Sequence, residues 1–262
     1  MTLHNILQFA EIADTAENNL PLAGNADSTT GAGTLLERFQ SQFDVLPANT
    51  LERVRIAQRI RYQVYCVEHS HEKADDPDGE EMDEFDSHAA QSLLIHRAAK
   101  TPLGTVRLIL PRPDALHRSF AVQRVMDAAA LSEFQKFPLQ TTGEVSRFSI
   151  SRQFRRIAGL SNGGADIDLL GSSGPLMRLG LIQALVRMSR EHGITHWCAA
   201  MEPTLLRMLS AMAIRFRPIG PLVEYHGLRQ PAYCVLADVL KAVRDERPAF
   251  WSILTEDGAR IH

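Results

Sequence analysis

TGEVSRFSISR, residues 142–152, is the stretch of sequence that decides the fold of this chain. Its apolar members supply the β-branched and aromatic content of a buried strand: Val145, Phe148 and Ile150. The same run holds a carboxylate, a hydroxyl and a guanidinium, on Glu144, Ser146 and Arg147. Charged groups are seldom buried without a partner. The run is therefore either an edge strand with a solvated Glu–Arg pair or the wall of a site.

The composition is that of an ordinary globular protein, with 262 residues of which 45% are hydrophobic and 23% charged. A net charge of −3 without a lysine-rich tail gives no indication of nucleic-acid binding. No apolar run is long enough to span a membrane, and no secretory signal is recognisable. The three cysteines form no CxxC pair, which predicts reduced, core-packed thiols in a cytoplasmic protein (Cys66, Cys198 and Cys234).

Residues 1–33 are expected to form a flexible tail, because Asn18 to Gly33 has little apolar surface to bury. A single domain follows over residues 34–262. Phe39, Phe43 and Val45 fall on near-alternate positions and predict a first strand that ends at Pro47. Residues 51–68 have the three- and four-residue spacing of a helix.

Further along, residues 91–98 and 104–110 predict an antiparallel hairpin, and the 142–152 strand follows a polar loop. A long helix is predicted over residues 175–191, a strand over 195–200 and a helix over 203–213. Strands over 215–225 and 231–237, a helix over 238–246 and a tail from Trp251 complete the chain. This order predicts a mixed α/β (α+β) domain with a largely antiparallel sheet and a helix on each face. The middle strands are too close in sequence for the helical crossovers of a doubly wound fold.

Two loops carry weak motif matches. The acidic segment 75–86 lacks the ligand register of a calcium loop, and His69 and His71 have no second ligand pair for zinc, so no metal site is predicted. A solvated acidic loop is the simplest interpretation. The Gly159 to Gly163 run matches the nucleophile-elbow pattern by chance, because three arginines separate it from the strand.

Four motifs occur in order: Arg61-x-x-x-Tyr65, Glu81-x-Asp83-x-x-Asp86, Gly104-x-x-Arg107 and Glu144-x-Ser146-Arg147-Phe148. Their order and gaps resemble those of the acyl-homoserine-lactone synthases, relatives of the GNAT acyltransferases. RYQVYCVE (61–68) and VEYHGLRQPAYC (223–234) resemble more closely the exosortase (PEP-CTERM) system-associated acyltransferases, and N-acyl amino acid synthases share the architecture. The resemblance covers roughly residues 35–250 and implies a GNAT-like acyltransferase fold with splayed fourth and fifth strands. His71 stands where the lactone synthases have a tryptophan, which favours acyl transfer without a lactone product.

Moving an acyl group from a thioester to an amine needs a base for the amine proton. The resemblance implies that Glu144 is this base, directly or through a water, and that its burial raises its pKa. It also implies that N–H groups on or just after Phe148 to Ile150 receive the oxyanion. The predicted catalytic residues are Glu144, Arg107 and Ser146. The predicted substrate-binding residues are Arg61, Tyr65, Asp83, Asp86, Arg147 and Phe148.

We expect Arg107 and Arg147 to hold Asp83, Asp86 and Glu144 in a buried network. Two roles are open for this network: it binds the amine and carboxylate of an amino-acid acceptor, or it only pins the acidic loop to the sheet.

The donor site is predicted from Ile150, Arg152, Arg155, Arg156 and Gly159. Arg156-x-x-Gly159-x-Ser161 only partly matches the loop that binds the pyrophosphate of coenzyme A in GNAT enzymes, which favours an acyl carrier protein. The three arginines either receive this acidic partner or form a solvated basic turn.

The predicted function is therefore an N-acyltransferase that moves a long-chain fatty acyl group from acyl-ACP, or acyl-CoA, to an amino acid or similar small amine, with no bound cofactor. Two alternatives are open: a lactone autoinducer synthase that uses S-adenosylmethionine, and a non-catalytic lipid-binding module of the same fold.

Overall fold

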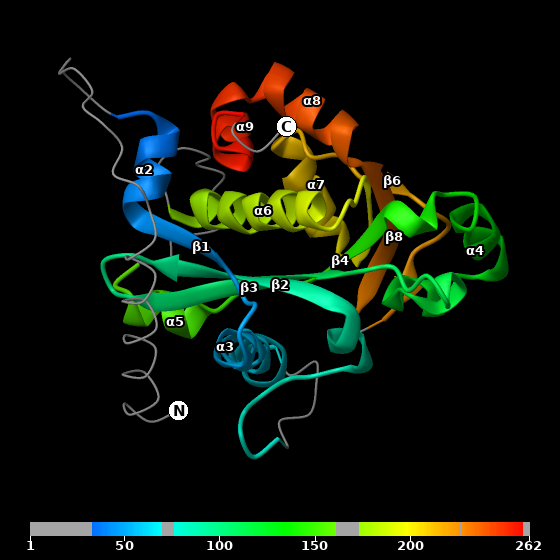
Figure 1. Ribbon diagram of the computed structural model, residues 1–262, viewed down its shortest axis with the longest axis horizontal. Coiled ribbons are helices and arrows are strands. Elements are labelled where there is room, and N and C mark those ends of the chain that lie inside the picture. Colours follow the sequence, from blue (N-terminus) through cyan, green and yellow to red (C-terminus); the bar gives the residue numbers. More distant parts are fainter. Residues whose placement is uncertain (1–32, 70–75, 161–172, 226, 259–262) are drawn as a thin grey trace.

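A mixed sheet forms the centre of the computed structural model, which describes residues 33–69, 76–160, 173–225 and 227–258 (Figure 1). Within these ranges the strand order is β1-β2-β3-β4-β5-β8-β6, and β7 pairs with β8. The strands are β1 (Phe43–Pro47), β2 (Ala89–His96), β3 (Thr101–Ile109), β4 (Thr142–Ile150), β5 (His196–Met201), β6 (Arg217–Pro218), β7 (Val223–Glu224) and β8 (Leu228–Val235). Neighbours are antiparallel except β4 and β5, which are parallel. The predicted mixed, mostly antiparallel sheet is confirmed.

Helices cover both faces of the sheet (Figure 1). On one face lies α6 (Ser173–Glu191), which packs against β1, β2, β3 and α9 (Pro248–Thr255). Helices α2 (Leu35–Gln42) and α8 (Leu236–Glu246) pack against α9. The other face carries α3 (Leu51–Tyr62), which continues into a π-helical turn (Gln63–Glu68), and the short helix α5 (Arg152–Ile157). The side chain of Thr50 caps α3, with its Oγ1 3.3 Å from the N–H of Arg53.

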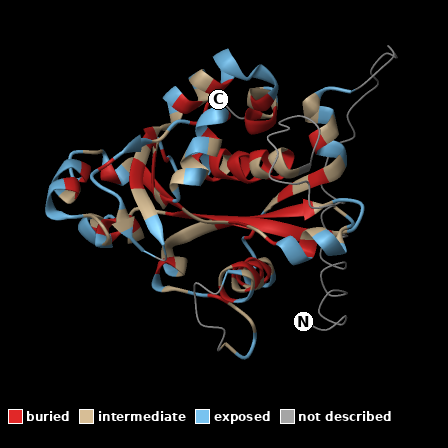
Figure 2. Ribbon diagram, turned by 180° about the vertical axis from the view of Figure 1, so that it is seen from behind, coloured by how far each residue is buried: buried red, intermediate tan, exposed pale blue. Residues whose placement is uncertain are grey.

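Burial follows this layering. Buried residues run along the central strands and along α6 (Figure 2). A second cluster of buried apolar residues surrounds Phe120 and Phe134 beneath α4 (Ala128–Phe134), beside the 3₁₀ turn Ala121–Arg124. The helix α7 (Pro203–Ala211) follows β5 directly. All three cysteines are buried and free, as predicted.

Several predicted elements differ from the structure. The single strand predicted over residues 215–225 is wrong: two short strands, β6 and β7, form there, and Gly220 with a φ of +72° interrupts the extended backbone between them. Phe39 lies in α2 rather than in a strand, because Thr34 and Glu37 form a capping box that starts a helix there. The hairpin turn lies before Thr101, so β3 begins three residues earlier than predicted. The predicted tail from Trp251 is wrong: α9 buries Phe250, Ile253 and Leu254. The tail predicted over residues 1–33 lies almost entirely outside the described residues.

Strand β4 lies in the middle of the sheet, between β3 and β5. The interpretation of residues 142–152 as a solvated edge strand is therefore wrong. Glu144 is buried with 4% of its surface exposed, and Ser146 and Arg147 are half-buried. The polar side chains of this strand accordingly need partners from other parts of the chain.

Candidate active site

A cavity opens where β4 and β5 separate. The two strands pair only at Thr142–Glu144 and His196–Cys198, and this matches the predicted splaying of the fourth and fifth strands. The cavity has a volume of about 440 Å³. Its walls come from β4 beyond Glu144, the end of β5, the start of β8 and the turn after α3. The parallel strands thus leave a gap in the middle of the sheet that a ligand can enter.

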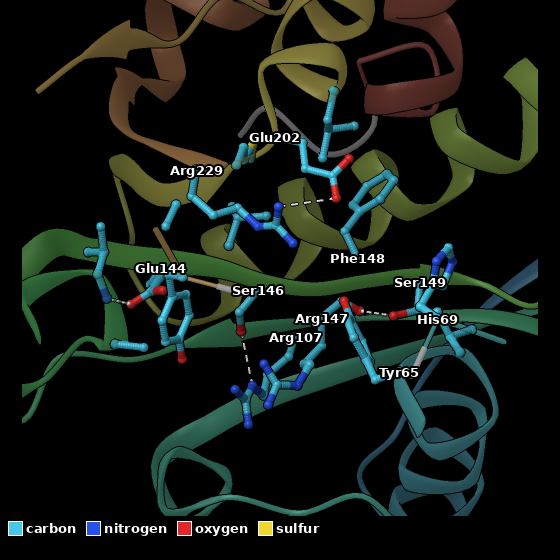
Figure 3. Close-up of a pocket in the computed structure, with 18 of the residues that line it drawn as sticks. Tyr65, His69, Arg107, Glu144, Ser146, Arg147, Phe148, Ser149, Glu202 and Arg229 are labelled. Atoms are coloured by element: carbon cyan, nitrogen blue, oxygen red, sulfur yellow. Dashed lines mark hydrogen bonds and ion pairs between the residues drawn. The ribbon is translucent and has the colours of Figure 1, made fainter. Parts of the chain in front are cut away.

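A β-bulge in β4 aims two consecutive side chains at the same group of residues. Arg107 pairs with Ser146 and Thr105 with Ser149, so β4 has one residue more than β3 in this interval. Arg147 takes the extra position with a φ of +49°, in the left-handed region. In a regular strand Ser146 and Arg147 would point to opposite faces. The bulge brings both to the side of Arg107 (Figure 3).

An ion cluster of three arginines and three carboxylates lies on that side. We call it the charged cluster: Arg61, Arg107, Arg147, Glu81, Asp83 and Asp86. Arg107 binds Asp83 through two parallel contacts, Nη1 to Oδ1 at 2.6 Å and Nη2 to Oδ2 at 2.8 Å. Its Nη1 also donates to Asp86, at 2.9 Å, and its Nε donates to the Ser146 hydroxyl, at 3.0 Å. These bonds fix Arg107 in one orientation.

The other two arginines complete the charged cluster. Arg61 is fully buried and donates to Asp86 from Nη1 (2.6 Å) and Nη2 (3.0 Å), and its Nε donates to Glu81. Arg147 donates from Nη2 to Glu81 (2.7 Å) and Asp83 (3.1 Å), and its guanidinium lies 5.1 Å from the ring centre of Tyr65. The charges of the cluster therefore balance among its own members.

The carboxylates of the charged cluster stay ionised. Burial by itself would raise the pKa values of Glu81, Asp83 and Asp86, but the hydrogen bonds and positive charges of the arginines outweigh it and hold all three below their usual range. Groups with lowered pKa values are poor proton acceptors near neutral pH. The charged cluster therefore supplies rigidity rather than a base.

The pKa of Glu144 is shifted in the opposite direction from those of the cluster carboxylates. Burial raises its pKa to about 7, although the backbone N–H of Val122, 3.0 Å from Oε2, and the charge of Arg107 oppose the shift. It lines the cavity, and within the described residues it has no hydrogen bond or ion pair with an arginine. The prediction that Arg107 and Arg147 hold Asp83 and Asp86 is confirmed, but for Glu144 it is wrong, because a backbone N–H holds this carboxyl.

The cavity brings together most of the predicted catalytic and substrate residues. Those that line it are Tyr65, Asp83, Arg107, Glu144, Ser146, Arg147, Phe148 and Ile150. Arg61 and Asp86 lie behind this wall, in the charged cluster. The Ser146 oxygen accepts from Arg107, so the hydroxyl proton is available to donate into the cavity.

The predicted donor residues on and after α5 lie outside the cavity wall. Arg152 and Arg156 are exposed and Arg155 is half-buried, and Gly159 has a φ of +73° just after the C-terminal end of α5. The Arg156–Gly159 segment therefore does not form a phosphate loop at a helix N-terminus, and Ser161 lies outside the described residues.

Glu68 occupies the N-terminal end of α5. Its carboxylate accepts hydrogen bonds from the Ser151 hydroxyl (2.8 Å) and from the N–H groups of Arg152 (3.0 Å) and Gln153 (3.1 Å). Burial would raise its pKa, but these bonds lower it. A side chain of this chain thus already fills the position where an anionic ligand would meet these N–H groups.

Five ionisable residues of the cavity wall were not among the predicted site residues: His69, Arg178, Glu202, Tyr225 and Arg229. Tyr225 and Arg229 belong to the VEYHGLRQPAYC motif, so the sequence contained a signal for these two. Within the described ranges no group of His, Cys, Asp and Glu side chains could hold a metal ion, and no helix there is long and apolar enough to cross a membrane.

Comparisons with known proteins agree with this geometry. Residues 60–162 match the family model described as an acetyltransferase (GNAT) domain, and no curated protein sequence matches the chain. Similar solved structures include the CoA-dependent acyl-homoserine lactone synthase BjaI with SAM and isopentyl-CoA (18% identity, 82% of this chain and 88% of that chain, TM-score 0.52). A second is TofI in a ternary complex with an inhibitor and MTA (18% identity, 80% of this chain and 99% of that chain, TM-score 0.53). A third is FeeM, an N-acyl amino acid synthase from uncultured soil microbes (14% identity, 77% of this chain and 95% of that chain, TM-score 0.52). The chain has a GNAT-like fold, its residues 60–162 match the model of an acetyltransferase (GNAT) domain, and it is an enzyme of the acyltransferase class.

Proposed function

We propose that the protein is an N-acyltransferase that moves a long-chain fatty acyl group from an acyl carrier protein to the amine of an amino acid or similar small acceptor. One observation carries this proposal: Glu144 lies in the wall of the cavity between β4 and β5 with a pKa of about 7, while the neighbouring carboxylates are held ionised. A base with this pKa is suited to remove the amine proton near neutral pH.

The reaction needs one proton to leave the amine and one to reach the thiol. The amine nitrogen attacks the thioester carbonyl carbon, and its proton passes to Glu144, directly or through a water. N–H groups of β4 around Phe148 to Ile150 are proposed to stabilise the oxyanion, since β5 does not pair with this part of β4. The C–N bond is then complete, the C–S bond breaks, and the leaving thiolate takes a proton. The Ser146 hydroxyl can donate this proton to the thiolate, because Ser146 lines the same wall of the cavity as Glu144.

The cavity also offers an apolar environment for an acyl chain. Its lining includes Val64, Val145, Phe148, Met201 and Leu205. Burying methylene groups against such side chains is favourable by about 0.8 kcal/mol each. These residues support a fatty acyl donor rather than an acetyl donor.

The choice of carrier protein over free acyl-CoA rests on α5. Glu68 occupies the N–H groups at its N-terminal end, so a pyrophosphate there would have to displace a carboxylate. The exposed side chains of Arg152 and Arg156 offer an acidic carrier a basic surface instead. The resemblance of residues 223–234 to the exosortase-associated acyltransferases stays a prediction.

The test is thiol release from long-chain acyl-ACP and acyl-CoA in the presence of each amino acid, with the product identified by mass spectrometry. We expect an N-acyl amino acid, with acyl-ACP as the better donor. Release of methylthioadenosine from S-adenosylmethionine would instead show a lactone synthase. A co-purifying fatty acid without turnover of any amine would show a lipid-binding module.

A further inference from the structure

The charged cluster has no cation to spare for a ligand. Each of its arginines binds at least two of its carboxylates, and these pair with no cation outside the cluster in the described part of the chain. A ligand carboxylate that bound Arg107 would leave Asp83 without its main partner, which is costly for a partly buried ion. The acceptor's carboxylate, if it has one, therefore needs a different cation.

Arg229, at the start of β8, is a cation of the cavity wall that can bind such a carboxylate. It lines the cavity with only 14% of its side chain exposed, so it is largely shielded from bulk water. Its Nη1 lies 3.2 Å from Glu202 Oε1 and 3.2 Å from the Leu228 carbonyl. Among the described residues, its Nε and Nη2 have no partner. A guanidinium with free donors in a shielded wall is suited to bind a carboxylate through two hydrogen bonds.

Glu202, the partner of Arg229, is the exposed member of this pair. Half of its side chain (51%) is exposed, and it meets Arg229 through one contact rather than two. Such a contact is weak and easily exchanged. Figure 3 shows the pair on the opposite side of β4 from Arg107, Arg147 and Tyr65, and thus apart from the charged cluster.

Arg229 lines the same cavity as the predicted base Glu144. Strand β8 places it there, because Met201 pairs with Gln230 and the antiparallel register brings Arg229 beside Glu202 at the end of β5. Phe148 of β4 lines this cavity as well. An acceptor held by Arg229 would thus have its amine in the cavity that Glu144 and the unpaired part of β4 line.

We propose that Arg229 binds the carboxylate of the acceptor and that Glu202 occupies the guanidinium until the acceptor arrives. The acceptor is then an α-amino acid rather than a simple amine. This inference rests on the proposed N-acyltransferase function. S-adenosylmethionine offers the same α-amino carboxylate, so free amino acids and S-adenosylmethionine are separate arms of the test.

The experiment compares amino acids with their carboxamides as acceptors. In the native protein we expect the free acid to be preferred. Arg229→Met should lower kcat/KM for the acid roughly 10- to 100-fold, the usual effect of losing a hydrogen bond to a charged group, and should leave the carboxamide and the acyl donor KM unchanged. Glu202→Gln should lower the KM for the acid, because Arg229 is released. Arg217→Met, at an exposed position on β6, is the matched control.

Equal losses for acid and carboxamide, or a raised KM for the acyl donor, would overturn the inference. Calorimetric titration of the preferred acid, and of S-adenosylmethionine, gives a readout independent of turnover. If no amine supports turnover but Arg229→Met abolishes binding of the acid, the proposed function fails while the carboxylate site stands. If turnover occurs without preference for the acid, the site fails while the function stands.

Discussion

Replacing Glu144 by glutamine tests the proposed base most directly. Glutamine keeps the shape of the side chain and an oxygen that accepts the N–H of Val122, so only the titrating group is lost. With a pKa of about 7, roughly one tenth of Glu144 is ionised at pH 6 and nine tenths at pH 8. We expect native kcat/KM to rise about tenfold over this interval, in proportion to the ionised fraction. Glu144→Gln should lower it about 10²- to 10⁴-fold and abolish this part of the pH dependence.

The same substitution should change stability with a defined sign. Burial raises the pKa of Glu144 from 4.5 to about 7, so the folded state favours the protonated form. The stability that this carboxyl contributes is fully present below pH 4.5 and is lost as the pH rises through about 7. The difference corresponds to about 3 kcal/mol at pH 8. Glu144→Gln should therefore be more stable than the native protein at pH 8, by about 6–10 °C in melting temperature, and nearly equal at pH 5.

The assay combines thiol release between pH 5.5 and 9 with thermal melting in the same buffers. Glu84→Gln, which changes an exposed carboxylate outside the cavity, is the control and should leave the pH profile of the rate unchanged. The reasoning is refuted if Glu144→Gln keeps the native rate, or if it melts like the native protein at pH 8.

Three other predictions concern the architecture around the site. Arg61→Met removes the buried counter-charge of Glu81 and Asp86 and should destabilise the protein by about 3–5 kcal/mol, whereas the half-exposed control Arg97→Met should cost less than about 1 kcal/mol in denaturant unfolding. Gly143→Ala would place a Cβ 2.8 Å from Leu108 Cδ1 and should cost about 1–3 kcal/mol, measured the same way. The folded protein should not react with a thiol reagent at pH 8, because its cysteines are buried, and burial raises the pKa values of two of them (Cys198 and Cys234). Rapid labelling of the native protein would contradict this packing.

Much of the fold could be predicted where the spacing of apolar residues and the residues at the ends of the segment indicated the same element. The helix over residues 175–191 and the strand over 195–200 correspond closely to α6 and β5. The errors have identifiable physical causes. Phe39 and Phe43 suit a strand or a helix equally well, and the capping box of Thr34 and Glu37 is what starts a helix before Phe39. Helix α9 likewise begins at Pro248, and proline is favoured at the first helical position.

The sequence predicted which residues form the site better than it predicted the contacts among them. The motif spacing brought Arg107, Asp83 and Ser146 together correctly. The partner of Glu144 is a backbone N–H, which has no signature in a sequence. The place of Arg229 depends on the register of β8 against β5, a long-range pairing that local patterns do not encode.

The bulge of β4 at Arg147 depends on the acidic segment that precedes η3 (Glu84–His88). A non-glycine residue in the left-handed region is strained by about 1–3 kcal/mol and persists only where its surroundings hold it. Here the holding groups are Glu81 and Asp83, from a stretch that looks in the sequence like a solvated loop. Shortening this loop would release the bulge and turn the Arg147 side chain away from the charged cluster. The number of residues between α3 and β2 therefore decides whether Glu81 and Asp83 can reach Arg147 and hold the bulge of β4.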